Sequence, residues 1–332
     1  MKTYRKLLLT WALIICSTVL FAQSNRTQAD SLLKQGVTLN DAGKFAEAVA
    51  KYDEILKTEP NNVTALYEKG FSLSAAGKSD EAIACFEKIT STANFPDAYV
   101  GLANIYDSKG DYEKALSYYM KGIAIAPKNR NLWFNLSVSY ARQQKYPQSE
   151  SAAAEAIKAD PKHISSYRNY AVAAYLQGRN AEALLGLSNY LMFGVPANQS
   201  AGACQIVKEI LRTSPKSDAG PIAKMQQETI VQAAKLATAG KTNLTPTDSL
   251  TIQLTAVYKV IKTQEAQYGS PFFSRYFGDF FGRIAESNYM DVFTHFIAVS
   301  LSPQDNLAWL KTRQDDIKAF NIWLNTQKRQ TE

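Results

Sequence analysis

Few of the side chains that carry out chemistry stand at spacings that would let them act together. The chain has two histidines and three cysteines. Neither His163 nor His295 has a second histidine or a cysteine at the spacing of metal ligands, so no metal site is expected. Glycine-rich phosphate loops, nucleophile elbows, zinc-protease motifs and calcium loops do not occur in the sequence. The sequence therefore predicts no catalytic residue and no cofactor.

One group of ionisable residues leaves an alternative open. Asp279, Glu286 and His295 lie in the C-terminal third, where the fold could bring them into one pocket. The alternative function is then an enzyme that handles envelope carbohydrate or peptidoglycan from a site in this helical region. The simpler interpretation is that these carboxylates form ion pairs on a helix surface with arginines one turn away, such as Arg275.

Composition excludes several classes of protein. The chain has 332 residues, of which 46% are hydrophobic and 20% charged, which is typical of a folded chain and not of a disordered or polytopic membrane protein. Its formal charge of +7 includes Lys2, Arg5 and Lys6, and falls to +4 without them. A charge of that size does not point to nucleic acid as a partner.

The N-terminal pattern is typical of a targeting segment. A basic start precedes the uncharged apolar run Leu7–Leu20, which is shorter than the roughly twenty residues of a membrane-spanning helix. Because the small residue Ala22 then precedes a polar stretch, residues 1–22 are predicted to be a secretory signal peptide, with Gln23 as the first mature residue. The segment resembles signal peptides of Bacteroidetes. We expect an exported protein, periplasmic or outer-membrane-associated, without a transmembrane span in the mature chain; a retained N-terminal anchor is the alternative.

Residues of one kind recur along the chain at a constant interval of 33 or 34 residues. Small residues, second-helix packing residues and turn residues form three such series: Gly36, Gly70, Ala103, Ser137, Ala171; Ala48, Ala82, Ala115, Ser149, Ala183; and Gly43, Gly77, Gly110, Gln144, Gly178. A repeat of this length indicates an array of helical hairpins that stack and share one core.

The pattern resembles the tetratricopeptide repeat (TPR), as in LLKQGVTLNDAGKFAEAVAKYDEILKTEP from Leu32. The resemblance implies an all-α fold, a right-handed TPR helical-hairpin solenoid over residues 23–197 followed by a helical C-terminal region over residues 198–332. The five predicted repeats are Ala29–Asn62, Val63–Phe95, Pro96–Asn129, Arg130–His163 and Ile164–Ala197. Repeat four has Gln144 at the turn and Ser149 at the packing position, so looser packing is expected there.

The C-terminal third is expected to be helical without the strict period. Its predicted helices are Ala201–Thr213, Pro221–Ala239, Pro246–Tyr268, Pro271–Glu286, Tyr289–Ser300 and Gln304–Thr326. Residues 273–304 are either a degenerate sixth repeat or part of a helical cap on the array. The aromatic row Phe273, Phe277 and Phe281 is either a docking helix for a partner or, as we favour, part of the core. Cys85 and Cys204 are expected to be buried free thiols, although a disulfide is possible in an oxidising compartment.

The resemblance also implies a function. First helices of tetratricopeptide repeats line a concave groove that takes a peptide, and the positions that would face it here are Tyr67, Phe71, Asn104, Asp107, Phe134, Arg142, Arg168 and Tyr175. The acid-binding clamp of chaperone-docking repeats is missing, because Leu33 and Val37 stand at its opening positions. We expect a scaffold for protein–protein interaction at the bacterial cell envelope, a soluble subunit of an outer-membrane-associated complex. The partner would be a protein or peptide with apolar anchors and an acidic residue towards one end.

Overall fold

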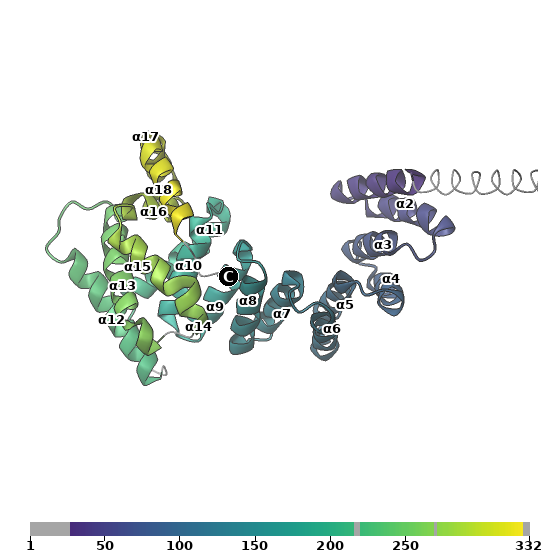
Figure 1. Ribbon diagram of the computed structural model, residues 1–332, viewed down its shortest axis with the longest axis horizontal. Helices are drawn as coiled ribbons and strands as arrows, with labels where there is room; N and C mark the ends of the chain where they lie inside the picture. Colours follow the sequence, from purple (N-terminus) through teal and green to yellow (C-terminus); the bar gives the residue numbers. More distant parts are fainter. Residues whose placement is uncertain (1–26, 216–219, 269–270, 328–332) are drawn as a thin grey trace, which may run out of the picture. The chain divides into compact units, whose positions relative to one another are not determined.

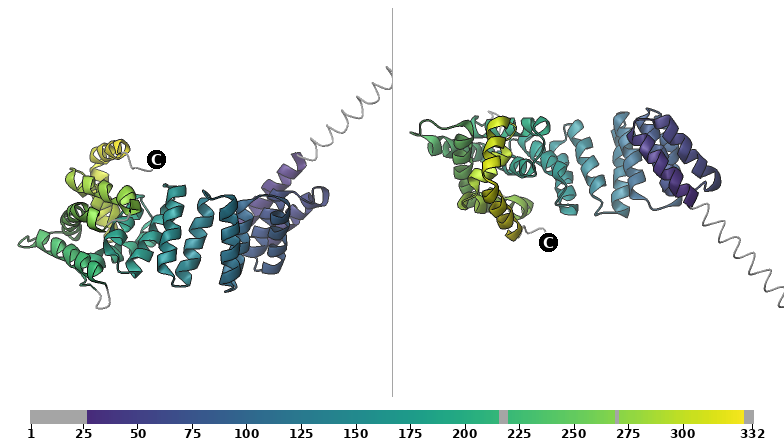
Figure 2. Two further views of the ribbon diagram at one scale, coloured as in Figure 1. Left: turned by 60° about the horizontal axis from the view of Figure 1, so that its bottom comes forward. Right: turned by 90° about the horizontal axis from the view of Figure 1, so that it is seen from above.

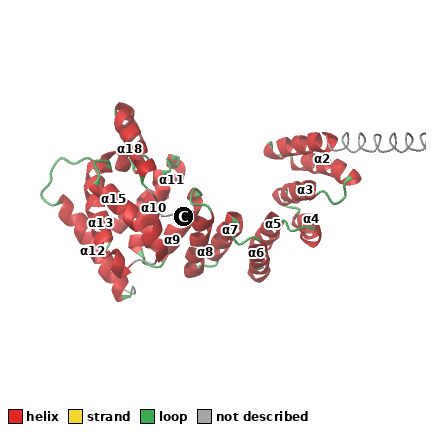
Figure 3. Cartoon of the chain, in the orientation of Figure 1, coloured by secondary structure: helices red, strands yellow, loops and turns green. Residues whose placement is uncertain are grey.

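The computed structural model describes residues 27–215, 220–268 and 271–327. The predicted signal peptide, residues 1–22, lies outside this part. Within it, every regular element is helical, and Figure 3 shows only helices joined by loops. The predicted all-α fold, with hairpins of the tetratricopeptide type followed by further helices, is confirmed.

Paired antiparallel helices make up the first part of the chain (Figure 1). After a first helix that includes residues 27–41, the paired helices are α2 (Phe45–Thr58), α3 (Val63–Ala75), α4 (Ser79–Thr92), α5 (Pro96–Ser108), α6 (Tyr112–Ile125), α7 (Arg130–Arg142), α8 (Tyr146–Ala159), α9 (Ile164–Leu176) and α10 (Asn180–Met192). The helices α3, α5, α7 and α9 begin at the first residues of predicted repeats two to five.

The chain divides into two compact units, one ending at Pro127 and the other beginning at Lys128. This division differs from the predicted domain boundary after residue 197. The reason is that residues of α8 and α9 share one apolar core with helices from the C-terminal third, whereas the core residues of α3, α4 and α5 cluster among themselves. The unit that ends at Pro127 is called unit 1, and the unit that begins at Lys128 is called unit 2.

Close helix contact in each hairpin depends on the small residues of the repeat. In unit 1, a Cβ atom added to Gly70 of α3 would lie 2.9 Å from the Phe86 ring of α4. Any larger residue at this position would push the two helices apart. Phe86 itself is 2% exposed and packs with Leu66 and Leu73, so the hairpin has its own apolar centre.

Repeat four closes its hairpin without a glycine. Gln144 takes a φ of 57°, in the left-handed region where the turn residues Gly77, Gly110 and Gly178 lie at 77° to 79°. The same backbone hydrogen bonds form in each turn; for example, the Lys145 N–H donates to the Tyr140 carbonyl at 2.9 Å. The turn geometry is therefore kept, at the cost of a side chain in an unfavourable conformation.

The substitution Gln144→Gly is expected to raise the free energy of unfolding by about 1 kcal/mol, because glycine adopts the left-handed conformation without a steric penalty. Urea denaturation followed by circular dichroism would measure the change. Gly110→Ala is the matched control and should lower stability by a similar amount. Equal stabilities of Gln144→Gly and the parent chain would contradict the assignment of strain to this turn.

The expectation of looser packing in repeat four is wrong within the hairpin itself. Ser137 of α7 and Ser149 of α8 are both fully buried. The Ser149 hydroxyl donates to the Ser137 carbonyl at 2.8 Å, and the Asn169 amide donates to the Ser137 hydroxyl at 3.0 Å. The serines thus keep the close contact of glycine and alanine and satisfy their hydroxyls by hydrogen bonding.

Unit 2 continues with helices that enclose α10. They are α11 (Ala197–Arg212), α12 (Pro221–Thr238), α13 (Pro246–Tyr268), α14 (Pro271–Phe273), the π-helix η1 (Ser274–Gly278), α15 (Asp279–Glu286), α16 (Met290–Ile297), α17 (Pro303–Thr312) and α18 (Gln314–Thr326). Because α9, α11, α12, η1 and α16 all pack on α10, every residue from Ala181 to Leu191 is buried. Figure 2 shows the teal hairpins of this unit side by side, with the green helices packed at their end. The C-terminal helices therefore cover the end of repeat five.

The last helices of the C-terminal third are shorter than expected. The helix expected over Gln304–Thr326 is broken at Arg313, where φ is −118° and ψ is 38°, so that α17 and α18 are separate. The helices α15 and α16 span only eight residues each, whereas those of repeats two to five span 13 or 14. The degenerate sixth repeat over residues 273–304 stays a prediction.

The docking interpretation of the aromatic row is wrong, and the core interpretation holds. Phe273, Phe277 and Phe281 are at most 1% exposed. The Phe277 ring stacks on Tyr170 of α9 at a centroid distance of 5.4 Å and meets Tyr167 edge-on at 5.8 Å. These contacts attach η1 to repeat five and leave no aromatic surface for a partner.

Both cysteines of the described residues are free and buried, as expected. In unit 2, the Cys204 thiol donates to the Ile297 carbonyl at 3.1 Å and accepts from the Ser300 hydroxyl at 2.9 Å. Burial raises the pKa of Cys204 and of Cys85, so both thiols stay protonated and unreactive near neutral pH.

Candidate partner-binding faces

The first helices of unit 1 present apolar side chains to solvent. Val37 is 36% exposed and Phe71 is 51% exposed, and the two occupy the same position in consecutive repeats. The hydrogen bond from the Ser72 hydroxyl to the Asn40 side chain, 2.7 Å long, joins these two helices. We call Val37, Asp41, Tyr67, Glu68, Phe71 and Asn104 the unit 1 face.

The unit 1 face also carries two carboxylates, Asp41 and Glu68. Burial and the neighbouring Asp41 carboxylate raise the pKa of Glu68 above its usual value. The adjacent Lys69 does not relieve this repulsion, because its ammonium is held by Asp53 at 2.6 Å. Burial first, then Asp97 and Glu68, raise the pKa of Tyr67. The face therefore suits a partner segment that carries apolar and basic side chains.

Not every predicted groove position in unit 1 is open. Tyr67 is half-buried, with its ring 5.8 Å from Phe86 and 5.3 Å from Phe95. Asn104 is exposed and accepts from the Tyr119 hydroxyl at 2.6 Å. The prediction for Asp107 is wrong, since it is only 5% exposed. It lies one turn after the fully buried Ala103 on α5, which places it on the packed side of that helix.

The remaining predicted positions belong to unit 2. Arg142 at the end of α7 and Arg168 on α9 are exposed. Phe134 is half-buried, and its ring meets His163 edge-on at 4.8 Å. Tyr175 is half-buried, and its pKa is raised to about 12 by burial and by the Glu209 carboxylate. The two arginines are therefore the predicted residues of unit 2 most open to a partner.

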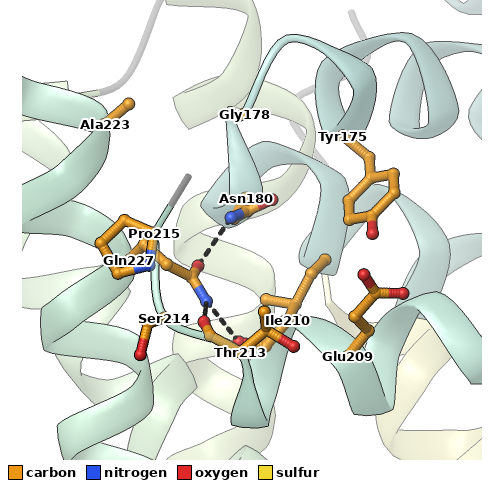
Figure 4. A pocket seen from close by; sticks show the side chains of 10 residues that line it. All are labelled: Tyr175, Gly178, Asn180, Glu209, Ile210, Thr213, Ser214, Pro215, Ala223 and Gln227. Carbon is orange, nitrogen blue, oxygen red and sulfur yellow. Dashed lines mark hydrogen bonds between the residues drawn. The ribbon is translucent and has the colours of Figure 1, made fainter. Parts of the chain in front are cut away.

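A small pocket lies beside Tyr175 (Figure 4). Its volume of about 40 Å³ has room for no more than one or two water molecules. Gln227 fills its floor: the amide nitrogen donates to the Ile210 and Thr213 carbonyls at 2.7 and 2.6 Å, and the amide oxygen accepts from Asn180 at 2.7 Å. These hydrogen bonds of Gln227 hold the C-terminal end of α11 in place. The pocket has no space for a larger ligand.

A buried ionic cluster joins repeats four and five, and the sequence analysis missed it. Arg179, in the turn before α10, pairs with Glu150 of α8 at 2.6 Å and with Glu182 of α10 at 2.8 Å. The two carboxylates are 8% and 4% exposed. The signal in the sequence was glutamate beside the packing residues Ser149 and Ala183. The cluster is a structural brace between the two repeats. Because one arginine pairs with two carboxylates, its net charge is negative.

The residues of the alternative enzyme site are engaged separately. Asp279 pairs with Arg283 at 3.3 Å, and Glu286 pairs with Lys262 at 2.8 Å. The His295 ring stacks on Trp309 at 3.7 Å. Within residues 27–215, 220–268 and 271–327, no three His, Cys, Asp or Glu side chains group as metal ligands, and no helix has the length and apolar content needed to cross a membrane.

Comparison with known proteins agrees with the fold. Residues 37–193 match the family described as "Psidin, N-terminal TPR repeats region". An alignment of 82 residues, 25% of this chain, is 33% identical to human serine/threonine-protein phosphatase 5 and covers 16% of it. A similar alignment is 32% identical to mouse tetratricopeptide repeat protein 28 and covers 3% of it. The chain thus matches only a small part of either relative.

Among solved structures, a thermophilic TPR protein of Thermus thermophilus superposes with a TM-score of 0.47 at 19% identity, over 54% of this chain and 99% of that one. On the family match, residues 37–193 are a tetratricopeptide-repeat region. These residues make up just under half of the chain, so the likeness is one of the repeat region and not of a whole protein.

Proposed function

We propose that this chain is exported and serves as an interaction scaffold at the bacterial cell envelope, where it holds or assembles protein partners as a subunit of an outer-membrane-associated complex. The N-terminal pattern of a basic start, an apolar run and Ala22 supports export. The observation that carries the interaction role is the half-exposed Phe71, one turn after Glu68 on α3. An exposed aromatic ring within a charged surface is typical of an interaction site.

The proposed partner has a mixed chemistry. Its apolar and basic side chains contact the unit 1 face, where Phe71 supplies contact area and Glu68 supplies charge. Unit 2 is a separate surface, on which Arg142 and Arg168 suit an acidic side chain of a partner, because guanidinium groups bind carboxylates in a bidentate manner. The repeats themselves supply no reaction in this proposal.

Affinity capture of the chain beginning at Gln23 from its native envelope tests the role. Phe71→Glu is expected to reduce recovery of the specific partner by about tenfold or more, since it removes an apolar anchor and adds a like charge. Met120→Glu is the matched control, because Met120 is 50% exposed but lies on the second helix of its repeat. Arg142→Glu with Arg168→Glu tests the basic residues. Recovery that is equal for Phe71→Glu and the parent chain would contradict the role of the unit 1 face.

A further inference from the structure

An open cleft in unit 2 is lined by the last three helices. Its volume is about 630 Å³, which is ample for a side chain with its neighbouring peptide groups. The turn before α16, the end of α17 and one side of α18 form its walls. The residues that give it chemical character are Tyr289, Asp291, Trp309, Arg313, Asp316 and Trp323.

One part of the cleft already holds a cation of the chain itself. The Arg313 guanidinium lies over the Trp309 ring at 5.4 Å from its centroid and pairs with the Asp316 carboxylate at 3.4 Å. An aromatic ring and a carboxylate on one guanidinium form a favourable site for a cation. The cleft therefore has the chemistry of a cation site, and the protein fills one half of it.

The other half of the cleft offers the same kinds of group, a carboxylate and aromatic rings. Asp291 is exposed, and in the described part of the chain no basic side chain forms an ion pair with it. Tyr289 and Trp323 line the same cleft, are half-buried, and lie 5.6 Å apart between ring centroids. Together these residues place a carboxylate and two aromatic rings in the lining of one cleft.

We propose that this half of the cleft binds a basic side chain, arginine or lysine, of a protein partner. With Arg313 paired to Asp316, the carboxylate of Asp291 leaves the lining with an excess negative charge. A sugar ring is a poorer fit, because Trp309 already stacks on His295 at 3.7 Å and has Arg313 over its ring. This site lies in unit 2 and is independent of the unit 1 face.

The test uses the full chain from Gln23 with 15N-labelled tryptophan and follows the indole N–H signals by NMR. The probe is acetyl-Gly-Arg-Gly-amide, and its neutral match replaces arginine with citrulline. We expect saturable shifts of the Trp309 and Trp323 signals with the arginine peptide, no shift of Trp133, and at least fivefold weaker binding of the citrulline peptide. Trp133 lies on α7 and serves as an internal reference.

Two carboxylates provide the variant and its control. Asp291→Asn should weaken binding of the arginine peptide at least fivefold. Asp315→Asn should leave binding unchanged, because Asp315 lies beside Asp316 in the first turn of α18 but pairs with Lys318 and does not line the cleft. Circular dichroism confirms that each variant is folded. Equal binding of the two peptides, an unchanged affinity in Asp291→Asn, or shifts without saturation would overturn the proposal.

Discussion

Replacing Arg179 with alanine is expected to lower the free energy of unfolding by about 3 kcal/mol at pH 7, because it leaves the buried Glu150 and Glu182 carboxylates without their counter-ion. The value is at the low end for a broken buried ion pair, since 34% of the Arg179 side chain is exposed and water can reach the gap. Thermal or urea denaturation would measure the loss.

The same variant has a predicted dependence on pH. Burial raises the pKa of Glu150 in the folded protein, while Arg179 acts in the opposite direction. Without Arg179 the folded-state pKa rises further above the unfolded value. An acid with a raised folded pKa destabilises the fold above that pKa, and the penalty disappears as pH falls to the unfolded value. The stability difference between Arg179→Ala and the parent chain should therefore shrink from pH 7 to pH 5.

Arg168→Ala is the control, because this arginine is exposed on α9. Its effect on the free energy of unfolding should stay within about 0.5 kcal/mol at both pH values. If Arg179→Ala costs no more than Arg168→Ala, or costs the same at pH 5 and pH 7, the buried cluster does not brace repeats four and five.

Phe277→Ala is expected to lower the free energy of unfolding by about 3–5 kcal/mol. The ring is fully buried, and removing it opens a cavity between η1 and α9, where it contacts Tyr167 and Tyr170. Because these contacts attach the C-terminal helices to repeat five, the variant should also expose apolar surface there. Urea denaturation measures the stability, and a dye that binds apolar surface reports the exposure.

The outcome separates a core role from a docking role. Phe71→Ala is the control, since Phe71 is 51% exposed and should cost less than about 1 kcal/mol. If Phe277→Ala leaves the stability unchanged but alters the mass measured by light scattering, the aromatic row mediates association between chains. That outcome would contradict its role in the core.

The repeat region was predictable because its constraints are local and periodic. Gly70 and Ala82 fix the distance between two helices, and Gly77 with its positive φ ends the first of them. Each repeat requires small residues and a turn residue at the same positions, so a departure at one position does not hide the pattern that the other repeats show. At Gln144 the turn forms without glycine, because backbone hydrogen bonds on both sides determine its geometry.

The C-terminal helices could be delimited but not arranged. Their order around α10 depends on contacts between residues far apart in sequence, such as Ser188 with Tyr258, and no period constrains these contacts. The π-helix at Ser274–Gly278 likewise leaves no clear mark in the sequence. The near-continuous apolar run of α10 was the one available signal that a helix would be buried on all sides.

The candidate faces were predictable in part. Position within the repeat identified Phe71, Arg142 and Arg168 as exposed residues. The prediction from repeat position failed for Asp107. A repeat position predicts which side of the helix a residue lies on to within about one turn, and the packing of the neighbouring helices determines whether that residue is exposed or buried. The two carboxylates of the unit 1 face and the cleft at Trp323 arise from residues of different helices, which periodicity does not connect.

The most direct test of the interaction role is site-specific photo-crosslinking in the native envelope. A benzoylphenylalanine at position 71 is predicted to form a covalent adduct with one protein partner, and the same group at position 120 is predicted to form none. Adducts of equal yield at both positions, or a single adduct only at position 120, would contradict a partner-binding face on the first helices of unit 1.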